Sequence, residues 1–166
     1  ACLDSLTMFI DQPIAPIALS ATQVDILCFG DFTGEIDLTV SGGTPATTGY
    51  TYDWNSGSFD TEDLVGISFG TYGVLVTDSL LCSDSLTVTL TQPQAPIDIE
   101  FDILNVSCFG DSTGTVSASI TGGTVPYTWS WDLPITDNTL FIDSLPAAGY
   151  ILNVTDSNRC TYSETA

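Results

Sequence analysis

The sequence predicts an all-β protein built from tandem immunoglobulin-like β-sandwich repeats of about 80 residues. One observation is an internal repeat: Cys28-Phe-Gly-Asp-Phe-Thr-Gly34 returns as Cys108-Phe-Gly-Asp-Ser-Thr-Gly114, and a Gly-Gly-Thr sequence at 42–44 returns at 122–124. The other is that apolar and polar residues alternate along the chain, while no segment shows apolar residues at helical spacing. Together these patterns indicate an array of β-rich units.

The alternation also assigns the individual strands. Ile36, Leu38 and Val40 alternate with polar residues, which predicts a strand with one face toward solvent, and residues 116–120 repeat the pattern. Further strands are expected at 50–54, 127–131, 72–76, 150–154, 86–90, 64–67 and 97–104. This gives about seven strands in each repeat, the number typical of an immunoglobulin-like sandwich.

Turn residues separate these strands. In the turn at 31–34, we expect the Asp31 carboxylate to accept a backbone N–H and Gly34 to supply a positive φ before the next strand. Pro93 and Pro96 lie between the repeats, where proline restricts the backbone and removes N–H donors from the sheet. The sequence therefore predicts a semi-rigid junction.

The repeat divides the chain into three parts. We expect residues 1–16 to be the C-terminal strand of a preceding repeat, 17–96 a complete immunoglobulin-like repeat, and 97–166 a repeat that lacks its last strand. The chain is thus expected to be part of a longer polypeptide. As a further hypothesis, the strand at 2–10 completes a sandwich that begins upstream or in a neighbouring chain.

The charge excludes several classes of partner. The net charge is −20, with Arg159 as the single basic residue, which makes binding to nucleic acid an improbable function. No apolar run approaches the roughly twenty residues of a membrane helix, so no membrane insertion is expected. Salt and divalent cations screen such self-repulsion, which favours an extracellular location over the cytosol.

Five cysteines occupy two repeated positions. Pairing within each repeat predicts disulfides Cys28–Cys82 and Cys108–Cys160, and leaves Cys2 to pair outside this chain. Each bridge would close a loop of about fifty residues, stabilise its repeat by roughly 2–4 kcal/mol and imply an oxidising compartment. Buried free thiols are the alternative, whereas a zinc site lacks both histidine and paired C-x-x-C cysteines.

Catalysis has little support in this sequence. There is no histidine for a catalytic triad and no Gly-rich loop with lysine for a nucleotide, so we expect no enzyme activity and no cofactor. Trp54, Trp129 and Trp131 could stack on sugar rings, although strict alternation favours a place in the core. Calcium is the other candidate ligand, through aspartates near strand ends: Asp31, Asp37, Asp78, Asp111 and Asp156.

Taken in order, these motifs resemble the SprB-type repeat of giant surface adhesins from gliding and related Bacteroidota. The resemblance rests on the cysteine followed by Gly-Asp-x-Thr-Gly, the Gly-Gly-Thr, the aromatic strand ending at Trp54 or Trp131, and Val-Thr-Asp leading to Cys82 or Cys160. It covers nearly the whole chain. Residues 45–49 interrupt the family's Gly-Gly-Thr-Pro-Pro-Tyr, and Asn-Arg replaces the usual glycine before Cys160.

The resemblance implies a cell-surface array of immunoglobulin-like units that is exported by type IX secretion. The expected function is a structural and adhesive stalk in adhesion, gliding motility or attachment, whose partners are neighbouring repeats, a homo-oligomeric filament and an unidentified surface or glycan target. The alternative is a carbohydrate-binding module of a secreted polysaccharide-degrading protein. Exposure of the tryptophans discriminates between the two.

Overall fold

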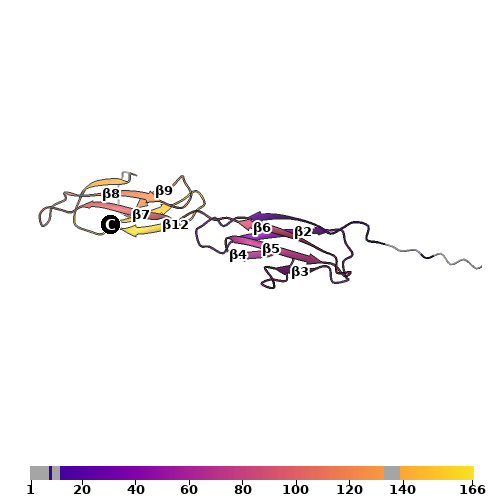
Figure 1. Ribbon diagram of the computed structural model, residues 1–166. Helices are drawn as coiled ribbons and strands as arrows, with labels where there is room; N and C mark the ends of the chain where they lie inside the picture. The colour runs from indigo at the N-terminus through magenta and orange to yellow at the C-terminus, as the bar shows by residue number, and fades with distance from the viewer. Residues whose placement is uncertain (1–7, 9–11, 133–138) are drawn as a thin grey trace, which may run out of the picture. The chain divides into compact units, whose positions relative to one another are not determined.

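The structure is a computed structural model that describes residue 8, residues 12–132 and residues 139–166. The chain divides into two compact units. The first contains Ala1–Val24 and Gly34–Leu90, and the second contains Asp25–Thr33 and Thr91–Ala166. Figure 1 shows that strands make up the regular structure of both units.

The first unit is a sandwich of two three-stranded antiparallel sheets. One sheet has the order β1-β2-β4 and the other the order β3-β5-β6. Its strands are β1 (Ala18–Val24), β2 (Gly34–Ser41), β3 (Thr51–Trp54), β4 (Leu64–Ile67), β5 (Gly70–Thr77) and β6 (Ser83–Leu90).

Alternation along these strands produces the core of the first unit. Ile36 and Leu38 of β2 are buried while the polar residues between them are exposed, and Val74 and Val76 of β5 follow the same rule. Trp54 at the end of β3 is completely buried, and its Nε1 donates a hydrogen bond to the Thr61 carbonyl at 2.9 Å. The core therefore lies between the two sheets, as in other β-sandwiches.

The second unit repeats this architecture, with sheets ordered β10-β8-β7 and β12-β11-β9. Its core cluster contains residues from both sheets, including Ile99, Val116, Trp131 and Leu152. The strands are β7 (Asp98–Leu104), β8 (Gly114–Thr121), β9 (Thr128–Trp131), β10 (Phe141–Leu145), β11 (Ile151–Thr155) and β12 (Thr161–Thr165). The all-β, sandwich-repeat fold class expected from the sequence is confirmed.

Two expectations about the units are corrected. Within the described residues each unit has six strands, where about seven were expected. The expectation that residues 97–166 lack a last strand is wrong, since β12 pairs with β11 from Thr161 to Thr165. The expected strand at 2–10 lies outside the described residues except for Met8.

The boundary between the units also differs from the one that the repeat predicts. Residues 17–96 were expected to form one repeat, yet residues 25–33 within them belong to the second unit. In sequence these residues connect β1 and β2 of the first unit. The turn near Asp31 is present, but its positive φ occurs at Gly30 (+81°) and not at Gly34.

Candidate functional site

One aspartate organises the loop before the second cysteine of each unit. In the first unit, Asp78 Oδ2 accepts the Thr44 N–H at 2.9 Å, and Oδ1 accepts the N–H groups of Leu80 and Cys82, both at 2.9 Å. Hydrogen bonds from the backbone lower the pKa of Asp78, and the bond from the Thr44 N–H has the largest effect. Burial raises this pKa, while the bonds from Cys82 and Leu80 lower it further. The carboxylate thus fixes the backbone that carries Cys82.

Asp156 does the same in the second unit. Its Oδ2 accepts the Thr124 N–H at 3.0 Å, and its Oδ1 accepts the N–H groups of Asn158 and Cys160 at 2.9 Å. Both aspartates are among the buried residues although they are charged. Because three backbone donors satisfy each carboxylate, these groups stabilise a turn.

Cys160, which Asp156 positions, forms a disulfide with Cys28 inside the second unit. The two Cα atoms are 5.6 Å apart, within the usual range for a disulfide. This bridge joins the last cysteine of the second repeat to the first cysteine of the preceding repeat. The pairs expected from the sequence, Cys28–Cys82 and Cys108–Cys160, are therefore wrong.

Hydrogen bonds of the segment 25–33 explain the different pairing. The Ile26 N–H donates to the Thr91 carbonyl at 2.9 Å, and the Thr91 N–H donates to Asp25 Oδ1 at 2.8 Å. The Gly30 N–H donates to Gln92 Oε1 at 2.9 Å. These bonds hold the segment in the second unit, where Cys28 forms its disulfide with Cys160.

Asn158 adds another attachment for this segment. Its Nδ2 donates to the Leu27 carbonyl at 2.9 Å and to Thr124 Oγ1 at 3.1 Å. Gln92 and Asn158 were not predictable as site residues, because single polar residues near turns have no distinctive spacing. The repeated cysteine positions were the available signal, but they did not fix which repeats are joined.

Cys82 and Cys108 are free thiols, and both are exposed. Each is the repeat counterpart of a bonded cysteine, since Cys82 corresponds to Cys160 and Cys108 corresponds to Cys28. Cys2 lies outside the described residues.

The tryptophans belong mainly to the cores. Trp54 is 0% exposed and Trp131 is 9% exposed, and each Nε1 donates to a backbone carbonyl, of Thr61 and Thr139 respectively. Trp129 is half-buried, and its buried Nε1 has no acceptor among the described residues. Trp54 and Trp131 therefore offer no exposed ring face on which a sugar could stack.

The aspartates considered for calcium do not converge. Within residues 12–132 and 139–166, no group of three or more acidic, cysteine or histidine residues is arranged to hold a metal ion. The described part of the chain also contains no helix able to cross a bilayer.

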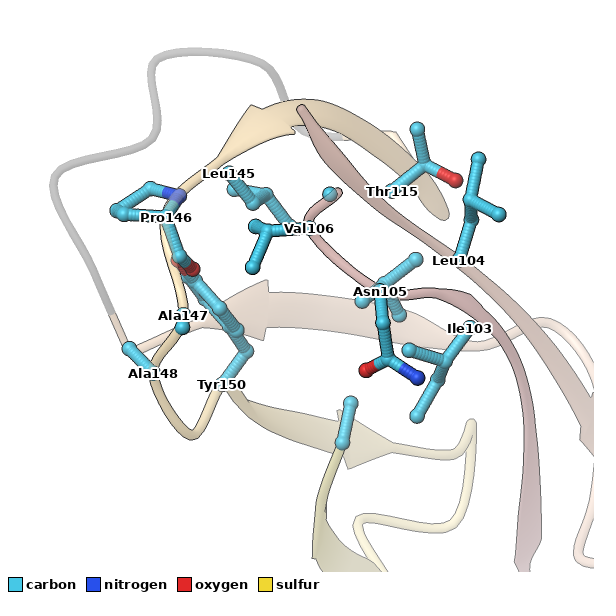
Figure 2. A pocket seen from close by; sticks show the side chains of 13 residues that line it. Ile103, Leu104, Asn105, Val106, Thr115, Leu145, Pro146, Ala147, Ala148 and Tyr150 are labelled. Carbon is cyan, nitrogen blue, oxygen red and sulfur yellow. The ribbon is translucent and has the colours of Figure 1, made fainter. Parts of the chain in front are cut away.

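The second unit has an apolar pocket at one end of its sandwich. Figure 2 shows Val106, Leu145 and Tyr150 around it, beside the loop that follows β10. Leu145 and Tyr150 are buried members of the core cluster. The pocket therefore borders the core of the second unit.

The family model described as the SprB repeat matches the chain twice, at residues 20–59 and 101–134. The first match begins within β1 and extends past β3, and the second begins within β7 and extends past β9. Both therefore cover equivalent parts of the two units. No curated protein matches this chain.

Proposed function

We propose that the chain is a structural segment of a long repetitive surface protein, because the SprB repeat model matches it at residues 20–59 and 101–134. It acts outside the cell as a semi-rigid stalk in adhesion, gliding or attachment. The polypeptide reaches the exterior by type IX secretion, and its neighbours are further repeats of the same kind. An unidentified surface or glycan is the target of the whole assembly.

The observation that carries this proposal is the Cys28–Cys160 disulfide between cysteines of successive repeats. The bridge links residues 132 positions apart and so spans most of both repeats in the sequence. Under tension, it stops extension of the polypeptide between its two ends, because a disulfide does not lengthen when noncovalent structure opens. A disulfide between successive repeats limits extension under load, which is what a stalk requires.

Two further features support a stalk over a ligand-binding module. Trp54 and Trp131, two of the three tryptophans on which the carbohydrate-binding alternative depended, are buried. A net charge of −20 discourages lateral association of parallel stalks through mutual repulsion. The stalk needs no catalytic group and no resident cofactor, and calcium acts only as a diffuse counterion.

Immunogold electron microscopy of the native cells tests the proposal. Antibody raised against this chain should label thin surface fibres at many points along their length. Antibody pre-absorbed with the purified chain is the control and should remove the label. Label found only on released soluble protein would contradict the stalk and favour a secreted module.

A further inference from the structure

The repeat cysteines fall into two kinds, an opening cysteine (Cys28, Cys108) and a closing cysteine (Cys82, Cys160). In the second unit, the closing cysteine bonds to an opening-cysteine loop, residues 25–33, that comes from the preceding repeat. We propose that the first unit binds the opening-cysteine loop of the repeat before it in the same polypeptide, and that Cys82 bonds to that repeat's opening cysteine. The inference rests on the proposed function, a long array of repeats, and deepens it by naming the contact that joins successive repeats.

The first unit has a groove beside Cys82 that fits this loop. Pro16 and Ile17 line the groove from the segment before β1. Gly43 lines it from the loop after β2, and Asp78 lines it from the turn before β6. We call this the Cys82 groove, and it places apolar surface next to the closing cysteine.

The segment before β1 is attached to the loop after β2 by a backbone hydrogen bond. The Gly43 N–H donates to the Ala15 carbonyl at 2.9 Å. In the second unit, the Gly123 N–H donates to the Ala95 carbonyl, also at 2.9 Å. These two parts of the groove therefore meet in the same way in both units.

The turn before the closing cysteine is also built alike. Oδ1 of Asp78 accepts the Cys82 N–H at 2.9 Å, and Oδ1 of Asp156 accepts the Cys160 N–H at 2.9 Å. Cys82 therefore has the backbone setting in which Cys160 bonds to Cys28. Such preorganisation lowers the ordering cost of binding the loop.

The second unit shows what a groove of this kind binds. Cys28 and Phe29 of the loop line one pocket together with Pro96, Ile97 and Cys160. The last three residues are the counterparts of residues that line the Cys82 groove. Because both repeats of this chain carry the motif Cys-Phe-Gly-Asp-x-Thr-Gly, we expect the preceding repeat to present a loop of the same form.

One polar attachment of the loop carries over to the Cys82 groove and another does not. The Gly30 N–H donates to Gln92 Oε1 at 2.9 Å, and the counterpart of Gln92 is Gln12, which lines the Cys82 groove. Asn158, whose side chain holds the loop by a second hydrogen bond, is replaced by Leu80. The contact in the first unit therefore keeps the glutamine bond and lacks the asparagine bond.

The covalent bond forms by exchange with a disulfide donor, either a small disulfide or a protein disulfide. The Cys82 thiolate attacks one sulfur of the donor, whose other sulfur leaves as a thiolate. The opening-cysteine thiolate then attacks the Cys82 sulfur, and the remaining half of the donor leaves as a thiolate. Two protein thiols become one disulfide, while the donor disulfide becomes two thiols that take up the two protons.

Applied along the array, this pairing gives a series of overlapping disulfides. The chain between the closing cysteine Cys82 and the opening cysteine Cys108 then joins one bridge to the next. Its roughly 26 residues reach about 90 Å when extended, whereas two repeats of about 80 residues would reach about 550 Å. Under tension the array is therefore limited to about one sixth of that extension, even where every sandwich opens.

Disulfide mapping of the native surface protein tests the pairing. Free thiols on intact cells are blocked with iodoacetamide, and the protein is then digested without reduction for mass spectrometry. We expect the Cys82 peptide to be joined to an opening-cysteine peptide of the preceding repeat, with the Cys28–Cys160 peptide as an internal control. An alkylated Cys82, or Cys82 joined to a cysteine of its own repeat, would overturn the proposal.

The purified chain tests the groove itself. A synthetic peptide of residues 25–33 is equilibrated in glutathione redox buffer with two variants of the full chain, which both carry Cys2→Ser. One also carries Cys108→Ser and offers Cys82, and the other carries Cys82→Ser and offers Cys108. We expect the equilibrium constant for the peptide disulfide to be about tenfold or more higher at Cys82, and equal constants would overturn the proposal.

A matched pair of glutamine variants locates the peptide in the groove. Gln12→Ala should lower the equilibrium constant at Cys82 about two- to tenfold. Gln94→Ala, which truncates an exposed glutamine outside the Cys82 groove, should leave it unchanged. The stalk and the pairing fail separately, because labelled surface fibres with an alkylated Cys82 would refute only the pairing, and a bonded Cys82 in released soluble protein would refute only the stalk.

Discussion

The two units share their strand order and their aspartate-centred turns. They differ in whether the loop that carries the opening cysteine belongs to the unit whose strands it connects. Residues 25–33, between β1 and β2, belong to the second unit and carry a bonded cysteine. The equivalent residues 105–113, between β7 and β8, remain with their own unit and carry an exposed thiol. The same motif therefore carries a disulfide-bonded cysteine in one place and a free thiol in the other.

This difference teaches that the repeat in sequence is not the unit of folding. The second unit takes its opening-cysteine loop, residues 25–33, from the repeat before it. Its closing cysteine, Cys160, bonds backward along the chain to Cys28 in that loop. Variants that act on one unit and spare the other test this difference.

The largest effect is expected from truncating the core tryptophan of one unit. Trp54→Ala should lower the free energy of unfolding of the first unit by about 3–5 kcal/mol, because it empties a fully buried site and leaves the Thr61 carbonyl unpaired. Thermal unfolding followed by calorimetry measures the loss. Trp131→Ala is the matched variant and should lower the stability of the second unit instead; a loss below about 1 kcal/mol in either would contradict the core assignment.

These core residues were predictable from the sequence, and the reason is physical. Alternation reports which side chains face the core, so Ile36, Leu38 and Trp54 were assigned without knowing any contact beyond their own strand. The disulfide was not predictable in the same way. Its pairing depends on bonds such as that from Ile26 to Thr91, between backbone groups that carry no sequence signal. The sequence therefore revealed that the cysteines repeat but not which repeats they join.

The second prediction concerns that disulfide. Replacing Cys28 and Cys160 together by serine should lower the free energy of unfolding of the second unit by about 2–4 kcal/mol and leave the first unit nearly unchanged. Urea unfolding with a probe in each unit separates the two effects. Cys82→Ser is the control and should change stability by less than about 0.5 kcal/mol, since its thiol is exposed and free. Peptides linking Cys28 to Cys82 in the mass spectrum would disprove the pairing.

A smaller loss of stability is expected from substituting Gly42, which has Gly122 as its counterpart in the second unit. A Cβ on Gly42 would lie 1.9 Å from the Pro16 carbonyl oxygen, and the residue has φ of +75°. Gly42→Ala should therefore cost about 2 kcal/mol or more. Gly30 has a similar φ of +81° but open space around its Cβ position, so Gly30→Ala should cost only about 1 kcal/mol. Equal losses in chemical denaturation would show that the close approach to Pro16 is unimportant.

Lowering the pH should reduce the stability of the first unit, because Asp78 becomes protonated. Because the folded state lowers the pKa of Asp78 below its usual 3.8, the stability from its ionised form is present above pH 3.8 and is lost as pH falls through the lower, folded-state value. Asp78→Asn should flatten this part of the stability curve measured by urea unfolding across acid pH. Asp84→Asn serves as a control at an aspartate beyond the turn, and an unchanged curve in Asp78→Asn would refute the assignment.

The smallest expected effect is the pH dependence due to Tyr52 of the first unit. Its counterpart in the second unit is Trp129, which cannot ionise. Burial, followed by the nearby Glu62 carboxylate, raises the pKa of Tyr52 to about 12 from its usual 10.0. The neutral phenol thus adds stability below pH 10 that is lost as pH rises toward 12. Besides Tyr162, whose pKa is also raised, chiefly by its hydrogen bond to Glu164, ultraviolet titration should show a late-ionising tyrosine that disappears in Tyr52→Phe and ionises earlier in Glu62→Gln. If Glu62→Gln left the titration unchanged while Tyr52→Phe removed the late step, burial alone would account for the raised pKa.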